Sequence, residues 1–204
     1  MTQRFQDSIV WITGGGTGIG KALAVEFAKE GAKLALSGRR RDRLESAADE
    51  LRALGAEVLV VPCDVTDEDS IDQAVSAVVA HFGKLDVCVA NAGFSVAGRI
   101  KKLRASDWRR QFDVNVIGLA STCRAVIPHL ERTKGRIALI GSVSALFPAP
   151  GLAPYSASKA AVRVIGASLS AELHGTGVSC TTIHPGFVES EIAAVRPCAA
   201  RRSA

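Results

Sequence analysis

Two side chains that suit proton transfer, Tyr155 and Lys159, lie four residues apart in the run Tyr-Ser-Ala-Ser-Lys. Positions four apart on a helix project from one face, so a helix over this run makes the phenol and the amine neighbours. A free phenol has a pKa of about 10 and is a poor base at neutral pH, whereas an adjacent ammonium stabilises the phenolate and lowers that pKa. The pair therefore predicts general acid/base chemistry, although ordinary surface pairs have the same spacing.

A second candidate site is a glycine-rich run that joins a short apolar segment to a stretch of helical period. It comprises Thr13, Gly14, Gly15, Gly16, Thr17, Gly18, Ile19 and Gly20. Strand, glycine-rich turn and helix in this order let the backbone approach a pyrophosphate, whose charge is held by N–H groups at the helix N-terminus. An ordinary tight turn is the alternative, and five glycines in seven positions favour the nucleotide site.

The residues after the second apolar run indicate which dinucleotide binds. Dinucleotide sites place an acidic residue about 20 residues beyond the turn, where it holds the ribose 2′-hydroxyl of NAD. Here that place carries Gly38, followed by Arg39. Gly38 removes the carboxylate that would repel a 2′-phosphate, and a guanidinium binds such a phosphate by charge-assisted hydrogen bonds. The sequence thus predicts NADP(H), unless the arginines from Arg39 to Arg43 only form a solvated helix start.

The elements that must position these residues can be read from hydrophobic periodicity. Short β-branched runs alternate with longer segments of helical period, which predicts βαβ units wound into a parallel sheet. The predicted strands are 8–13, 33–37, 57–61, 86–90, 135–141 and 178–184, and the predicted helices are 19–30, 41–54, 68–81, 105–132 and 154–174. Gly31, Gly55 and Gly83 stand where the first three helices should end. We predict an α/β fold, a doubly wound parallel sheet of Rossmann type with helices on both faces.

Length and composition bound the class of protein. The chain has 204 residues, with 48% hydrophobic, 22% charged and 5% aromatic residues and a net charge of +5, which predicts one globular domain over residues 1–191 and an irregular tail over 192–204. Few aromatic residues and interleaved charges argue against a nucleic-acid partner. No apolar run is long enough for a membrane helix, so we expect no membrane partner and a cytoplasmic protein. The five cysteines have no zinc-like spacing, which predicts reduced thiols and no metal.

Several groups of residues appear in a fixed order along the chain. They are Gly14-xxx-Gly18-x-Gly20, Asn91-Ala92-Gly93, Asn115, Ser142, Tyr155-xxx-Lys159 and Pro185-Gly186. Together they resemble the short-chain dehydrogenase/reductase family, from about Ile9 to Glu191. Ser142 precedes Tyr155 by 13 residues, the usual interval in that family.

The resemblance implies a hydride transfer between NADP(H) and a carbonyl or alcohol group, as in a carbonyl reductase. Tyr155 would give or take the proton on the substrate oxygen, and Ser142 would hydrogen-bond the same oxygen. Lys159 would hold the nicotinamide ribose and lower the pKa of Tyr155, and Asn115 would connect Lys159 to solvent through a water. Read alone, Ser142 is an ordinary polar residue at a strand end and Asn115 an ordinary buried helix asparagine.

The resemblance also implies cofactor contacts for residues at the carboxyl ends of strands, where open α/β sheets bind ligands. Asp64 and Val65 match the positions beside adenine, and Asn91, Ala92 and Gly93 match the central groove. Pro185, Gly186 and Val188 match the positions beside the nicotinamide carboxamide. With Tyr155 and Lys159, the remaining contacts come from Gly14, Thr17, Gly18, Ile19, Gly20 and Arg39.

The chain departs from the family pattern after Glu191, where members continue through a segment that covers the substrate and a last strand. We therefore expect strand 178–184 to form a sheet edge, and a truncated, cofactor-binding but catalytically weak protein with a regulatory or interaction role is the alternative function. Family members form homodimers or homotetramers through their long fifth and sixth helices, which are present here. A hydrophobic substrate is suggested by residues that could also be plain packing residues: Phe94, Leu146, Phe147, Pro148, Pro150, Leu152 and Phe187.

Overall fold

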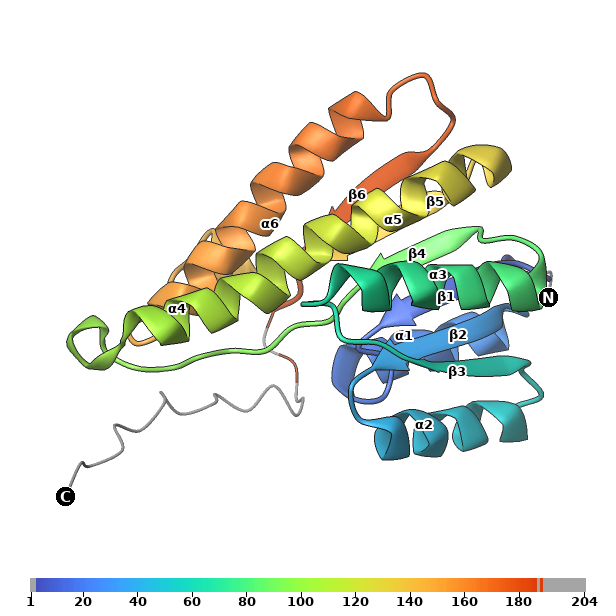
Figure 1. The fold of residues 1–204 in the computed structure, drawn as a ribbon, viewed down its shortest axis with the longest axis horizontal. Helices are drawn as coiled ribbons and strands as arrows, with labels where there is room; N and C mark the ends of the chain where they lie inside the picture. Colours follow the sequence, from blue (N-terminus) through green and yellow to red (C-terminus); the bar gives the residue numbers. More distant parts are fainter. Residues whose placement is uncertain (1–2, 187, 189–204) are drawn as a thin grey trace.

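A computed structural model describes residues 3–186 and residue 188, which form a twisted sheet between layers of helices (Figure 1). All strand pairs are parallel, and the strand order is β3-β2-β1-β4-β5-β6. The strands are β1 (Ile9–Thr13), β2 (Lys33–Gly38), β3 (Val58–Pro62), β4 (Val87–Ala90), β5 (Arg136–Ile140) and β6 (Ser179–Ile183). The predicted doubly wound sheet is confirmed, with the order reversing between β1 and β4, where such sheets bind ligands.

The central strands lack apolar alternation because both of their faces are covered. All five residues of β1 and all four of β4 are buried. The main helices are α1 (Gly18–Lys29), α2 (Arg41–Ala53), α3 (Glu68–Phe82), α4 (Ala105–Phe112), α5 (Gly118–Thr133) and α6 (Ala153–Glu172). One core joins the sheet to α1 and α2, and a second core joins its other face to α3, α5 and α6.

The predicted single helix over 105–132 is wrong in one respect. A π-helical turn, η2 (Asp113–Ile117), separates α4 from α5. Single π-helical turns occur within α-helical segments, and the apolar residues of this segment gave no separate signal for one. The predicted glycine ends are confirmed, since Gly31, Gly55 and Gly83 have φ angles of 84, 87 and 80°.

Within the described part of the chain, β6 is the last strand in the sheet and pairs only with β5. Its side chains alternate, with Ser179, Thr181 and Ile183 exposed. The predicted tail and Phe187 lie outside the described residues. No described helix is long and apolar enough to cross a membrane. Cys63, Cys88, Cys123 and Cys180 are free thiols, and burial raises the pKa of Cys123 to about 12, so that this thiol is unreactive.

Candidate active site

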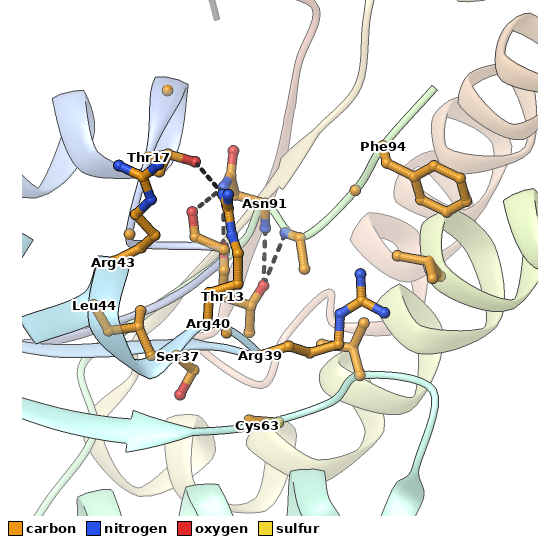
Figure 2. Close-up of a pocket in the computed structure, with 18 of the residues that line it drawn as sticks. Thr13, Thr17, Ser37, Arg39, Arg40, Arg43, Leu44, Cys63, Asn91 and Phe94 are labelled. Carbon is orange, nitrogen blue, oxygen red and sulfur yellow. Dashed lines mark hydrogen bonds between the residues drawn. The ribbon is translucent and has the colours of Figure 1, made fainter. Parts of the chain in front are cut away.

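A cavity of about 300 Å³ opens at the carboxyl ends of β1, β2 and β4 (Figure 2). The glycine-rich run at the start of α1 forms one wall, the segment that follows β4 forms a second, and the start of α2 forms a third. The N–H groups of the first turn of α1 have no partners within the helix, so this wall suits an anion. The cavity therefore has the place and the polarity of a nucleotide phosphate site.

Hydrogen bonds between Thr13 and Asn91 fix the shape of the glycine-rich turn. The Thr13 hydroxyl accepts from the backbone N–H groups of Asn91 and Ala92, at 3.1 Å each. The Asn91 amide donates to the carbonyls of Thr13 and Gly14, at 3.0 and 3.1 Å. Gly14 has a φ of 68°, and a Cβ on Gly20 would overlap the Gly14 carbonyl. Both glycines are thus required by the turn.

Three arginines surround the far side of this cavity. Figure 2 shows Arg39, Arg40 and Arg43 beside the same opening as Thr17 and Ser37. Arg40 Nη2 donates to the Thr17 hydroxyl at 3.4 Å. Guanidinium groups that converge in one cavity favour an anionic ligand, because they remain charged at all ordinary pH values.

Asp64 and Val65, after β3, line the same cavity. Burial raises the pKa of the Asp64 carboxyl, but hydrogen bonds from Thr66 and the positive charge of Arg39 more than offset this, so the pKa lies below its ordinary value. The Asp64 carboxylate accepts from the Thr66 backbone N–H at 3.0 Å and from its hydroxyl at 2.8 Å. It therefore stays charged and fixed at the cavity wall.

A second cavity of about 250 Å³ contains the residues predicted for proton transfer, Ser142, Tyr155 and Lys159. Pro185, Gly186 and Val188, after β6, line it as well. The two cavities are contiguous, since both are lined by Ile19, Asn91, Gly93 and Phe94. An extended ligand can thus reach from the three arginines to Tyr155.

Among the described residues of this site, Lys159 is the cation whose pKa is shifted most. Its side chain is buried, and Nζ donates to the Ile140 carbonyl at 2.7 Å and lies 5.9 Å from the centre of the Tyr155 ring. Burial lowers the pKa of Lys159 from 10.5 to about 8. The start of α6 places Tyr155 and Lys159 on one face. The prediction that the two side chains are neighbours is therefore confirmed.

Ser142 stands at the end of β5 and is buried. Its hydroxyl oxygen accepts from the Ser144 backbone N–H at 3.1 Å, which leaves the hydroxyl proton free to donate into the cavity. The Ser142 carbonyl lies 3.1 Å from His184 Nδ1, and the Val143 N–H donates to the Pro185 carbonyl at 3.0 Å. The residues after β5 are therefore held to those after β6.

Asn115 lies in η2 and contacts neither cavity. Its Oδ1 accepts from the Phe94 N–H at 3.1 Å, and its Nδ2 donates to the Phe94 carbonyl at 3.0 Å and to the Ser158 hydroxyl at 3.2 Å. The π turn thus directs a buried amide onto the segment that both cavities share. A water relay from Asn115 to Lys159 stays a prediction.

Of the residues predicted for catalysis and cofactor binding, all except Gly20 and Asn115 line one of the two cavities, whereas Leu146, Phe147, Pro148 and Pro150, suggested for the substrate, line neither. Gly20 and Asn115 are buried behind the walls. Sequence reasoning missed Ser37, Leu44, Cys63 and His184, and it gave Thr13 no role beyond membership of the glycine-rich run. Their common signal is position, since most of them stand at or just beyond the carboxyl end of a strand.

Comparison with known proteins agrees with this geometry. The family model for short chain dehydrogenases matches residues 8–198. An uncharacterized oxidoreductase of Staphylococcus aureus is 38% identical over 92% of this chain and 81% of its own length. A short-chain dehydrogenase/reductase from Burkholderia phymatum, solved in complex with NAD, has a TM-score of 0.89 and 34% identity, covering 92% of this chain and 68% of that one.

A further solved structure is an alcohol dehydrogenase from the archaeon Thermococcus sibiricus, complexed with 5-hydroxy-NADP. It has a TM-score of 0.88 and 31% identity, and the match covers 95% of this chain and 82% of that one. Fold, site and relatives together define an oxidoreductase. The chain belongs to the short-chain dehydrogenase/reductase family.

Proposed function

We propose that this protein transfers hydride between NADP(H) and a carbonyl or alcohol group, with Tyr155 as general acid and base. The observation that carries the proposal is the shared cavity wall that joins a basic, glycine-walled cavity to Ser142, Tyr155 and Lys159. Each half alone has a simpler explanation, either a turn or a surface pair. Their continuity is what a dinucleotide-dependent reaction at an alcohol carbon requires.

The residues present fit an extended dinucleotide. Gly14, Gly16 and Gly18 line the first cavity and carry no side chain, so the ligand would meet bare backbone there. Gly14, Thr17, Gly18 and Ile19 would hold the pyrophosphate, Asp64 and Val65 the adenine, and Pro185, Gly186 and Val188 the carboxamide. When bound, the nicotinamide supplies or accepts the hydride.

The chain itself moves the proton. In reduction, the Tyr155 phenol donates to the substrate oxygen, and in oxidation the phenolate accepts from it. The free hydroxyl proton of Ser142 hydrogen-bonds the same oxygen and polarises the carbonyl. Lys159, with a pKa of about 8, is mostly protonated at neutral pH and stabilises the phenolate that reduction leaves.

Substitution of Tyr155 by Phe tests the reaction. We expect oxidation of NADPH by a panel of ketones, followed by absorbance, to be lost in Tyr155→Phe while NADPH binding persists. The control is Thr176→Val, which removes a hydroxyl at the far end of α6. Unchanged turnover in Tyr155→Phe defeats the assigned role, and tight NADPH binding without turnover in the wild type favours the cofactor-binding regulatory alternative.

The preference for NADP(H) is proposed from the basic side of the first cavity. Gly38 and Arg39 replace the acidic residue that favours NAD, and Arg40 and Arg43 add positive charge. We expect Arg39→Ala to weaken NADPH binding by about 1.5–3 kcal/mol, the range of hydrogen bonds to charged groups, and NADH binding much less. The matched control is Arg41→Ala, an exposed arginine paired with Glu45. Equal losses for both cofactors refute the role in 2′-phosphate binding.

Assembly as a homodimer or homotetramer is proposed through the outer faces of α5 and α6. Val164 on α6 is 60% exposed and Ile117, just before α5, is 56% exposed, which is costly for large apolar side chains unless another surface covers them. Light scattering after size exclusion should give a multiple of 21.3 kDa, and Val164→Asp should reduce it. A monomeric wild type contradicts the proposal.

A further inference from the structure

A run of basic side chains follows Phe94 and Ser95, which line the second cavity, along the loop after β4 and into α4. We call it the basic rim, and it consists of Arg99, Lys101, Lys102, Arg104, Arg109 and Arg110, all of which are exposed. The acidic residue within this stretch, Asp107, is buried, and its carboxylate accepts from the Arg104 backbone N–H at 2.9 Å. The exposed surface of the stretch is therefore strongly positive.

Ion pairs neutralise several basic residues elsewhere on the surface. Arg4 pairs with Glu30, Lys33 with Glu57 and Arg124 with Asp72, at 2.7 to 3.0 Å. Apart from Asp107, which is buried within the stretch and has partners there, no carboxylate in residues 3–186 and 188 forms an ion pair with a side chain of the basic rim. Like charges close together repel each other and destabilise the folded chain, so an anionic ligand would stabilise this surface.

Several contacts tie the basic rim to the proton-transfer cavity. Phe94 and Ser95 line that cavity, and the guanidinium carbon of Arg110 lies 4.8 Å from the centre of the Phe94 ring. The side chain of Gln111, the next residue, is buried and bonds both the Phe94 carbonyl and the Val96 N–H, at 2.7 Å each. Stacking on a ring fixes a guanidinium plane while leaving its N–H donors free for an anion.

Two exposed apolar side chains lie in the loop between Ser144 and Leu152, two residues that line the second cavity. Leu146 is 53% exposed and Phe147 77% exposed, just beyond the short η3 helix (Val143–Ala145) that begins after Ser142. The Gly98 N–H donates to the Gly151 carbonyl at 2.8 Å, so the loop that precedes the basic rim is joined to the loop that carries Leu146 and Phe147. Figure 1 shows α4 and the start of α6 at the same end of the molecule.

We infer that the substrate is an amphiphilic carbonyl or alcohol compound with an anionic group, a carboxylate or a phosphate, that Arg110 binds at the cavity mouth. This inference rests on the proposed function for the reaction, and it refines the hydrophobic substrate expected from sequence. Leu146 and Phe147 contact the apolar body, while Arg110 hydrogen-bonds the anion and the other basic rim residues attract it. Arg110 is thus a specificity-determining residue and takes no part in proton transfer.

The test compares matched acids and esters. Methyl ketones of six, eight and ten carbons that end in a carboxylate are compared with their methyl esters and with keto alkyl phosphates of matched length. We expect wild-type kcat/KM to favour the anions, and Arg110→Gln to lower the acid-to-ester ratio by about 10- to 100-fold, as expected for a hydrogen bond to a charged group. Arg132→Gln, which removes an equal charge at the far end of α5, should keep the ratio. The preference should also weaken with added salt.

Binding of the same compounds to NADP⁺-saturated protein, followed by calorimetry, separates this inference from the proposed function. If no ketone is turned over but the acids bind more tightly than the esters and Arg110→Gln removes the difference, the reaction fails and the anion site stands. If ketones are turned over with equal kcat/KM for acid and ester, the anion site is overturned alone. Absence of any acid preference in both assays also overturns it.

Discussion

The buried ammonium of Lys159 should make the stability of this protein depend on pH in a way that one substitution removes. We compare Tyr155→Phe with the double variant Tyr155→Phe/Lys159→Met. The first substitution removes the phenol, so that its titration cannot differ between the two proteins. Methionine fills a similar volume without a charge.

The magnitude follows from the pKa of Lys159, which burial lowers from 10.5 to about 8. At about 1.4 kcal/mol per pKa unit, the shift from 10.5 to about 8 corresponds to about 3.5 kcal/mol of destabilisation while the amine is charged. The folded chain binds this proton more weakly than the unfolded chain does, so the destabilisation is fully present below pH 8. It is relieved as the pH rises from 8 toward 10.5.

Urea unfolding of both proteins between pH 7 and 10 measures the effect. The free energy of unfolding of Tyr155→Phe should rise by about 2 to 3 kcal/mol relative to the double variant over this range. All other titrating groups are common to both proteins and cancel in the difference. The unpaired Ile140 carbonyl in the double variant lowers its stability by an amount that does not vary with pH. A pH-independent difference between the two proteins refutes the assigned burial cost.

Three further substitutions test the construction of the site. Thr13→Val leaves the N–H groups of Asn91 and Ala92 without an acceptor, and urea unfolding should show a loss of about 2 to 4 kcal/mol, against no loss if solvent replaces the hydroxyl. Gly20→Ala should cost about 1 to 3 kcal/mol by overpacking and weaken NADPH binding in a fluorescence titration, and binding equal to that of the surface control Lys21→Ala contradicts this. Asn115→Ala should lower stability by about 2 to 4 kcal/mol through the unpaired Phe94 backbone groups, and a loss of activity without a loss of stability would favour a water relay instead.

Much of the fold could be predicted from the sequence because local signals and packing agree. The strand β1 is apolar at every position because helices cover both of its faces, and the same pattern recurs in β4. The end of α3 at Gly83 follows from the left-handed conformation that glycine adopts freely. The π turn η2 was not predicted, because it depends on a tertiary contact. The Asn115 amide forms hydrogen bonds with both the N–H and the carbonyl of Phe94.

In the candidate site, too, residues with a local sequence signal could be predicted, whereas residues that depend on tertiary contacts could not. Tyr155 and Lys159 could be paired from helical spacing, and Arg39 from its distance beyond the glycine-rich turn. The contacts of Thr13 and His184 could not be predicted, because their partners, Asn91 and Ser142, are distant in sequence and meet them only where parallel strands end together. Nor could the low pKa of Lys159 be foreseen, since it depends on burial by the whole domain.

The segment from Asn91 to Phe94 forms part of the wall of both cavities. Asn91 shapes the glycine-rich turn of the first cavity, and the Phe94 backbone is held by Asn115, whose amide also bonds Ser158 beside Lys159. Displacement of this segment therefore moves the walls of both cavities at once. Substitution of Asn91 should both raise KM for NADPH and lower kcat. Substitution of Arg39 should mainly raise KM for NADPH, and substitution of Ser142 should mainly lower kcat. The proposed cofactor binding and the proposed proton transfer would thus be linked through one short stretch of backbone after β4.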